Sequence, residues 1–253
     1  MSAKGAGSPA SPPSLHVLLT RKLLSYDTLS EREIDALQHA IEGTKGFSAG
    51  QDLVSADDRP EYSSILIEGW AARSKTLENG ARQITSIHIP GDFVDLHGFL
   101  LHKMDHSVVA LTACRIAKLS HERLRRITDD HPHLTRLLWL NTLVDAGIHR
   151  NWIVGMGRLP AAGHLAQLIC ELYVRLHAVS LADGHKFEFP LSQAVMADAL
   201  GFSPVHVNRT IRELRERNLI NWRARTLHIL DWEKLVAFAQ FDATYLSQMQ
   251  EPR

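Results

Sequence analysis

The strongest constraint on the fold lies in residues 191–220, which read LSQAVMADALGFSPVHVNRTIRELRERNLI. Ser192 is a typical N-cap residue ahead of a short apolar run at helical spacing, and Gly201 follows that run as a turn residue. Ser203 and Pro204 then supply an N-cap and a proline at the first position of a second helix. Two short helices joined by a glycine turn predict a helix-turn-helix, whose second helix enters the major groove of DNA.

The second helix of this pair is predicted to be amphipathic. Val207, Ile211 and Leu214 recur on one side at the spacing of a buried helix face. An ordinary helical hairpin with a solvated arginine face is the alternative, which the two caps and the glycine turn disfavour. The residues expected to contact DNA from this helix and its cap are Ser203, Val205, His206, Asn208, Arg209 and Arg212.

The segment LINWRARTLHILDW that follows reads as two strands around Arg223 and Arg225, a wing whose arginines are expected to contact phosphate. The formal net charge of the chain is zero, but its distribution is uneven. Residues 191–230 hold six arginines against three acidic residues, whereas residues 27–95 hold 13 acidic and 6 basic residues. A polyanion such as double-stranded DNA is therefore expected to bind the C-terminal segment.

A long helix is predicted from about residue 132 to 156, because proline opens a segment striped with apolar residues. Its apolar positions cover more than one face, which indicates two partners: the helix's own domain and a second copy of the chain. One wide face buried in a single core is the alternative. Gly155, Gly157 and Pro160 are expected to end this helix, and another helix is predicted over about 160–178.

The N-terminal half has the pattern of an antiparallel roll or barrel. Residues 46–118 contain short β-branched runs separated by turn signals, and helices are expected on either side, at about 30–42 and 121–129. The predicted fold is α+β, with an N-terminal antiparallel β-roll flanked by helices, a long dimerisation helix and a C-terminal winged helix-turn-helix domain. We expect a disordered tail at 1–14, a sensor domain at 15–131, the dimerisation helix at 132–157 and the DNA-binding domain at 158–253.

Composition excludes several classes of protein. Hydrophobic residues at 45% and charged residues at 22% are typical of folded globular chains, and 253 residues suit two domains. The two cysteines, Cys114 and Cys170, are too few for a disulfide scaffold or a four-thiolate metal site. We find no signal peptide, membrane span or catalytic constellation, so a cytoplasmic protein that is not an enzyme is expected.

With these features the chain resembles the Crp/Fnr superfamily of bacterial transcription regulators, most clearly at Gly91-Asp92-Phe93, similar to the family's GDF segment, and at residues 191–220. The resemblance implies a cyclic-nucleotide-binding-type β-roll and a homodimer that reads an inverted repeat, with RNA polymerase as a further partner. It also implies that Arg209 reads guanine. Many members carry a cytosine-reading glutamate where this chain has Val205, which leaves the half-site consensus open.

The resemblance also locates an effector pocket. In members that bind cyclic AMP, a Gly-Glu pair holds the ribose and an Arg-Ser pair holds the phosphate. Counting from Gly91, those places hold Asp95-Leu96 and His106-Ser107, which supply neither a ribose acceptor nor a guanidinium fork. We therefore expect that cyclic AMP does not bind in the family manner. The residues expected to line this degenerate pocket are Asp95, Leu96, His97, His106, Ser107 and His149.

Histidines are concentrated around this pocket, with His88, His97, His102 and His106 close in sequence. Resemblance to haem-binding members implies that His97 is a possible axial ligand of iron in a gas- or redox-sensing regulator. The favoured interpretation is that these are surface or hydrogen-bonded histidines in a roll that has lost its ligand, with no metal and no cofactor. A β-roll module that controls a partner protein without binding DNA is a further alternative.

Overall fold

The computed structural model describes residues 16–101 and 103–248. The tail predicted for residues 1–14 and His102 of the histidine-rich segment lie outside the described residues. Two helices come first, α1 (Val17–Leu24) and α2 (Glu31–Ala40). The predicted capping box begins α2, since the Ser30 N–H donates to the Glu33 carboxylate at 2.8 Å while the Glu33 N–H donates to the Ser30 hydroxyl.

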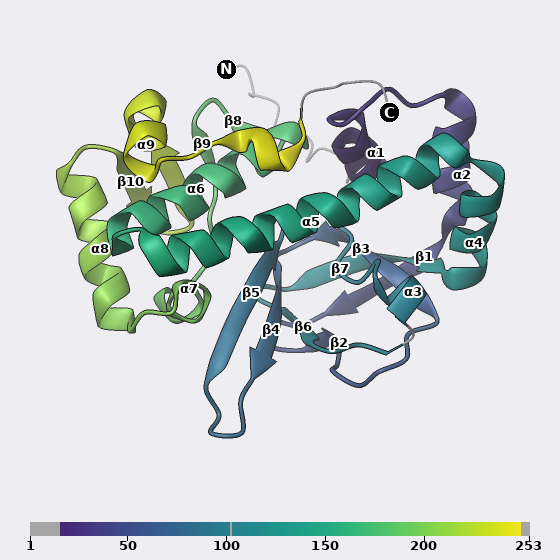
Figure 1. Cartoon of the computed structure of the whole chain (residues 1–253), viewed down its shortest axis with the longest axis horizontal. Helices are drawn as coiled ribbons and strands as arrows, with labels where there is room; N and C mark the ends of the chain where they lie inside the picture. Colours follow the sequence, from purple (N-terminus) through teal and green to yellow (C-terminus); the bar gives the residue numbers. More distant parts are fainter. Residues whose placement is uncertain (1–15, 102, 249–253) are drawn as a thin grey trace, which may run out of the picture.

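An antiparallel β-roll follows, as the alternation of β-branched runs and turns predicted (Figure 1). Its strands are β1 (Ile41–Phe47), β2 (Asp52–Val54), β3 (Tyr62–Glu68), β4 (Ala71–Thr76), β5 (Arg82–His88), β6 (Ser107–Ala110) and β7 (Cys114–Ser120). They form two sheets, in the orders β1-β7-β3 and β2-β6-β4-β5, with apolar side chains buried within the roll. The short helix α3 (Gly98–Leu101) lies between β5 and β6.

Two helices lead out of the roll, α4 (His121–Asp130) and α5 (Pro132–Arg158). Figure 1 shows α5 crossing the molecule from the α4 side to the C-terminal helices. The prediction that Gly155 and Gly157 interrupt this helix is wrong, because the helix runs through both of them and ends at Arg158, ahead of Pro160. A Cβ atom on Gly155 would lie 2.6 Å from Cδ2 of His164, so this glycine permits close packing of α5 on the next helix.

The C-terminal domain contains the predicted helix-turn-helix and wing. Its helices are α6 (Ala161–Ala178), α7 (Gln193–Leu200), α8 (Pro204–Glu216), α9 (Trp232–Ala239) and the 3₁₀ helix η1 (Ala243–Leu246). Its strands are β8 (Ala182–Asp183), β9 (Lys186–Glu188), β10 (Ile220–Arg223) and β11 (Thr226–Ile229), paired in the order β10-β11-β9-β8.

A buried ionic network joins the roll to the C-terminal domain. Arg175 of α6 donates to Oδ2 of Asp92 at 2.6 Å, to Oε1 of Glu171 at 2.8 Å and to the Ile87 carbonyl at 2.8 Å. Lys22 of α1 donates to the other oxygen of Asp92 at 2.7 Å. Asp92, the central residue of the GDF segment, therefore holds three elements together.

Candidate nucleic-acid interface and cavity of the β-roll

The helix-turn-helix is built by local capping, as the sequence predicted. The Ser192 hydroxyl accepts from the Val195 N–H to begin α7, and Gly201 ends that helix in the left-handed region at φ 72°. The Ser203 hydroxyl accepts from the His206 N–H, and Pro204 occupies the first position of α8. These contacts fix where α8 begins and therefore which of its side chains point outward.

One face of α8 is buried and the opposite face is open. Val207, Ile211 and Leu214 pack into the core of the domain. The predicted DNA-contacting residues that are exposed are Ser203, Val205, Asn208, Arg209 and Arg212. Val205 is 81% exposed, which is unusual for an apolar residue in a helix. The remaining predicted contact, His206, is half-buried and stacks on Phe202 with 4.7 Å between ring centroids.

The wing is the β10–β11 hairpin, and both of its predicted phosphate-contacting arginines are exposed. Arg223 makes no ion pair with a described residue. Arg225 donates from Nη2 and Nε to Oε1 of Glu188 in β9, at 2.7 and 3.0 Å. The sequence pattern did not reveal this ion pair, which depends on the pairing of β9 with β11.

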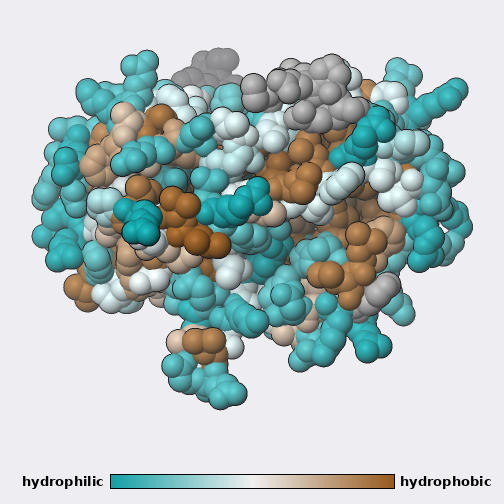
Figure 2. All heavy atoms as spheres, in the orientation of Figure 1, coloured by the Kyte–Doolittle hydropathy of each residue, from teal (hydrophilic) through white to brown (hydrophobic). Residues whose placement is uncertain are grey.

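The long helix α5 exposes a row of apolar side chains beyond those that it buries in its own chain. Trp139 is 66% exposed, Leu143 51% and Ile153 65%, and these three recur every three or four residues together with Ala146 and Arg150. We call Trp139, Leu143, Ala146, Arg150 and Ile153 the α5 seam. Figure 2 shows hydrophobic surface interspersed with hydrophilic surface on the face that α5 crosses. Val144 and Ile148, by contrast, are buried inside the chain.

A cavity of about 370 Å³ opens between the β-roll and α5. Of the six residues predicted to line an effector pocket, His97, His106 and His149 line this cavity. Asp95, Leu96 and Ser107 do not, and those expectations are corrected. The sequence reading missed these lining residues: Arg73, Lys75, Thr85, Asp105, Thr142, Asp145 and Ala146.

The three corrected residues have structural contacts instead. The Asp95 carboxylate is buried and accepts from the N–H and hydroxyl of Ser64 at 2.5 and 3.0 Å. Burial raises the pKa of Asp95 to about 7, against the lowering effect of these hydrogen bonds. The Ser107 hydroxyl accepts from the Ala56 N–H at 3.0 Å, and Leu96 faces a neighbouring apolar pocket. His88 is buried beside Asp92 and is not among the residues that line the cavity.

A guanidinium group does line the cavity, and it belongs to Arg73 of β4. Counting from Gly91 places the expected arginine at the position of His106 instead. Arg73 donates to Asp145 of α5 at 2.8 Å and lies 3.2 Å from Nε2 of His149. Burial alone would raise the pKa of Asp145, but Arg73, with His88 and His149, lowers it to about 2. The Arg73 charge is therefore already balanced by a carboxylate.

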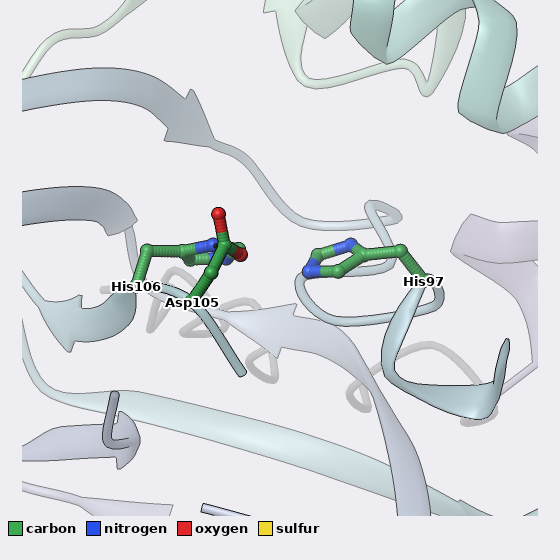
Figure 3. Close-up of side chains that lie close together, drawn as sticks. All are labelled: His97, Asp105 and His106. Atoms are coloured by element: carbon green, nitrogen blue, oxygen red, sulfur yellow. Dashed lines mark hydrogen bonds and ion pairs between the residues drawn. The ribbon is translucent and has the colours of Figure 1, made fainter. Parts of the chain in front are cut away.

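In the same cavity, His97, Asp105 and His106 form a cluster (Figure 3). The rings of His97 and His106 lie 4.9 Å apart, centroid to centroid. A porphyrin on the inward side of His97 would overlap the His106 ring, so the residues present do not fit haem in this arrangement.

Two family models match the chain. Residues 44–131 match the cyclic nucleotide-binding domain, and residues 163–238 match the Crp-like helix-turn-helix domain. The chain belongs to the Crp/Fnr family. Among its relatives, it is 25% identical to the transcriptional activator protein FnrL of Cereibacter sphaeroides over 79% of this chain and 81% of that protein. It is 26% identical to the nitrogen fixation regulation protein FixK of Bradyrhizobium diazoefficiens over 85% of this chain and 88% of that protein.

Solved structures show the same fold. FixK2 from Bradyrhizobium japonicum superposes with a TM-score of 0.69 at 20% identity, covering 78% of this chain and 96% of that one. A CooA mutant from Carboxydothermus hydrogenoformans gives a TM-score of 0.61 at 16% identity, covering 86% and 94%. Together with the exposed basic face of α8, the Crp/Fnr relatives show that this chain is a DNA-binding transcription regulator. Within the described residues, no helix is long and apolar enough to span a membrane.

Proposed function

We propose that this Crp/Fnr regulator binds as a homodimer to an inverted repeat, with α8 in the major groove and Arg209 reading a guanine in each half-site. The observation that carries the proposal is the open face of α8, where Val205 and Arg209 lie one turn apart and no ion pair with a described residue engages the guanidinium. A free guanidinium can donate two hydrogen bonds to O6 and N7 of guanine.

The α5 seam supports the homodimer. A second copy packed along it would bury Trp139, Leu143 and Ile153, which a lone chain leaves in water. Such a dimer is two-fold symmetric, so its two α8 helices would face half-sites about one helical turn of DNA apart, ~34 Å. We infer that it acts in the cytoplasm and contacts RNA polymerase, as family resemblance implies.

We further propose that cyclic AMP is not its effector. The Arg73 guanidinium is already paired with Asp145, whose carboxylate accepts from it at 2.8 Å and would repel a cyclic phosphate. The other cationic side chain lining the cavity, Lys75, is exposed. Calorimetric titration of the purified full chain with cyclic AMP is expected to give no heat of binding, whereas micromolar affinity would overturn this part of the proposal.

Selection of DNA from a random library by the purified full chain tests the function as a whole. We expect enrichment of a two-fold inverted repeat and a gel shift that weakens steeply with salt. The variant Arg126→Ala, which removes an exposed arginine of α4, is the control and should select the same repeat. Enrichment of a single unrepeated site would contradict the dimer, and the absence of any salt-dependent shift would favour a module that regulates a partner protein instead.

A further inference from the structure

The cluster of His97, Asp105 and His106 has the composition and burial of a metal site. The possible ligand atoms of the three residues all lie within 4.8 Å of one another. His97 comes from the turn just before α3, and His106 directly precedes β6, so two separate segments of the roll bring the rings together (Figure 3).

The two inner nitrogens are buried without a partner. Nε2 of His97 and Nε2 of His106 are both inaccessible to solvent and make no hydrogen bond with a described residue, and His106 as a whole is only 9% exposed. A buried polar atom without a partner costs about 1–3 kcal/mol, so each one needs an explanation, and a bound ion is one such explanation. Two of them side by side point to a shared ligand.

The hydrogen bond to Asp105 determines what kind of ligand His106 can accept. Its Nδ1 lies 2.7 Å from Oδ1 of Asp105, which places the proton of a neutral ring on Nδ1 and leaves a lone pair on Nε2. A carboxylate bonded to the outer nitrogen of a histidine is the usual support of a metal-binding imidazole. A neutral ring in this tautomer cannot donate from Nε2, which disfavours an anion at this point.

The charged side chains that act on the two rings are those of Arg73, Asp145 and Asp105. Since Arg73 is paired with Asp145, the charge nearest the two imidazoles that remains unbalanced is the Asp105 carboxylate, which favours a cation.

We propose that His97 and His106 bind one divalent transition-metal ion of the zinc type through Nε2 of each ring, with the Asp105 carboxylate orienting His106 from its outer nitrogen. Imidazole nitrogens are common protein ligands for such ions. The remaining positions would face the cavity, where water or a small molecule could complete the coordination.

The test uses the full chain, stripped with a chelator and titrated with Zn²⁺ at submicromolar free concentrations held by nitrilotriacetate. We expect one ion per chain, a raised melting temperature, and visible absorption from bound Co²⁺ that Zn²⁺ abolishes. His106→Ala should lose this ion. Asp105→Asn, which changes a largely exposed side chain and should not disturb folding, should weaken binding about tenfold to a hundredfold.

The matched control is His149→Ala, which removes a histidine from the same cavity but outside the cluster and should leave the affinity for Zn²⁺ close to that of the wild-type chain. Melting curves of each variant in chelator report folding separately from binding. The proposal is overturned by no equimolar ion, by equal loss in His149→Ala, or by unchanged affinity in Asp105→Asn. Stabilisation by inorganic phosphate without any by Zn²⁺ would likewise replace it with an anion site.

Discussion

At the scale of single residues, the outer face of α8 carries side chains of two kinds. Some are exposed and available to contact DNA, whereas His206 already packs against a neighbouring side chain. His206, which the sequence placed among the base-reading residues, stacks on Phe202 in the turn and is half-buried. Its spacing on the helix was predictable, but the stacking partner was not, because Phe202 lies outside the helical periodicity. Val205, Asn208 and Arg209 remain as the exposed residues of the first two turns.

Val205 is expected to determine one base of the half-site. An exposed valine at the helix start can contact the methyl group of thymine, whereas a glutamate there accepts from cytosine. Val205→Glu should therefore shift the preference at one base pair per half-site from T·A to C·G, at a cost of about 1–3 kcal/mol on the original site. Competition with single-base variants of the site measures this, and Val205→Ile is the control. A uniform loss across all bases would contradict a base contact.

The two wing arginines are expected to differ, because only Arg225 is paired in the free protein. Arg223→Ala should weaken binding to all sequences and reduce the salt slope by about one. Arg225→Ala should reduce the slope by less, since Glu188 already shares its guanidinium. Glu188→Ala should release Arg225 and strengthen binding to every sequence. If Glu188→Ala weakens binding instead, the ion pair orients Arg225 toward phosphate.

At the scale of elements, helix ends were predictable wherever a capping residue marks them, as Ser30, Ser192 and Ser203 do. The strand β4 was not predicted, because its sequence AARSKT lacks the β-branched alternation of its neighbours. Its Arg73 is nevertheless buried at the cavity. Arg73 reaches the cavity because β4 pairs with β6, where Arg73 lies opposite Val108. This pairing joins segments that are far apart in the sequence, so a local pattern could not indicate it.

The same reasoning explains which parts of the candidate sites could be predicted from the sequence. The face of α8 follows from local periodicity, so sequence could indicate which of its residues are exposed, with His206 half-buried, and their contact with DNA stays a prediction. The cavity is formed by strands and a helix far apart in the chain, and counting along one segment misassigned Asp95, Leu96 and Ser107 while omitting Asp145. The hydrogen-bond donors of a buried carboxylate, such as Ser64 for Asp95, depend on tertiary packing, which a sequence pattern does not reveal.

The α5 seam gives a prediction at this scale. Leu143→Asp should yield a folded monomer, since Leu143 is half exposed in the single chain and a carboxylate there would meet its symmetry mate. Val144→Asp should instead destabilise the fold by several kcal/mol, because Val144 is buried within the chain. Light scattering gives the mass and circular dichroism the fold, with Leu181→Asp, at an exposed apolar residue in the turn between α6 and β8, as control. A dimeric Leu143→Asp protein would place the interface elsewhere.

At the scale of the whole molecule, the sensor roll and the DNA-binding domain are connected through Asp92 and Arg175. Burial raises the pKa of Asp92, but Lys22 and Arg175 outweigh it and hold that pKa below its usual range. The carboxylate therefore stabilises the fold at neutral pH, and this stabilisation is lost as the pH falls below the usual carboxyl range. The exposed pair of Arg82 with Asp198, at 2.6 Å, is a second link between the domains.

These two links are expected to differ greatly in strength. Arg175→Leu leaves buried carboxylates on Asp92 and Glu171 without their shared guanidinium, so it should destabilise the chain by about 3–5 kcal/mol. Arg82→Leu removes a partly exposed pair and should cost about 0–1 kcal/mol. Urea denaturation at neutral pH measures both, and the cost of Arg175→Leu should shrink in acid as Asp92 protonates. Equal costs would show that the buried network does not hold the domains together.

The central claim, that Arg209 reads guanine from the open face of α8, is tested most directly by binding of Arg209→Ala and Arg209→Lys to all single-base variants of the selected site. Loss of the bidentate fork should cost about 1–3 kcal/mol and relax the preference at one base pair of each half-site, leaving the rest of the consensus intact. The lysine variant keeps the charge, so it should retain more affinity than the alanine variant while losing the same preference. Uniform weakening across every base variant, with the guanine preference preserved, would contradict this placement of α8 in the groove.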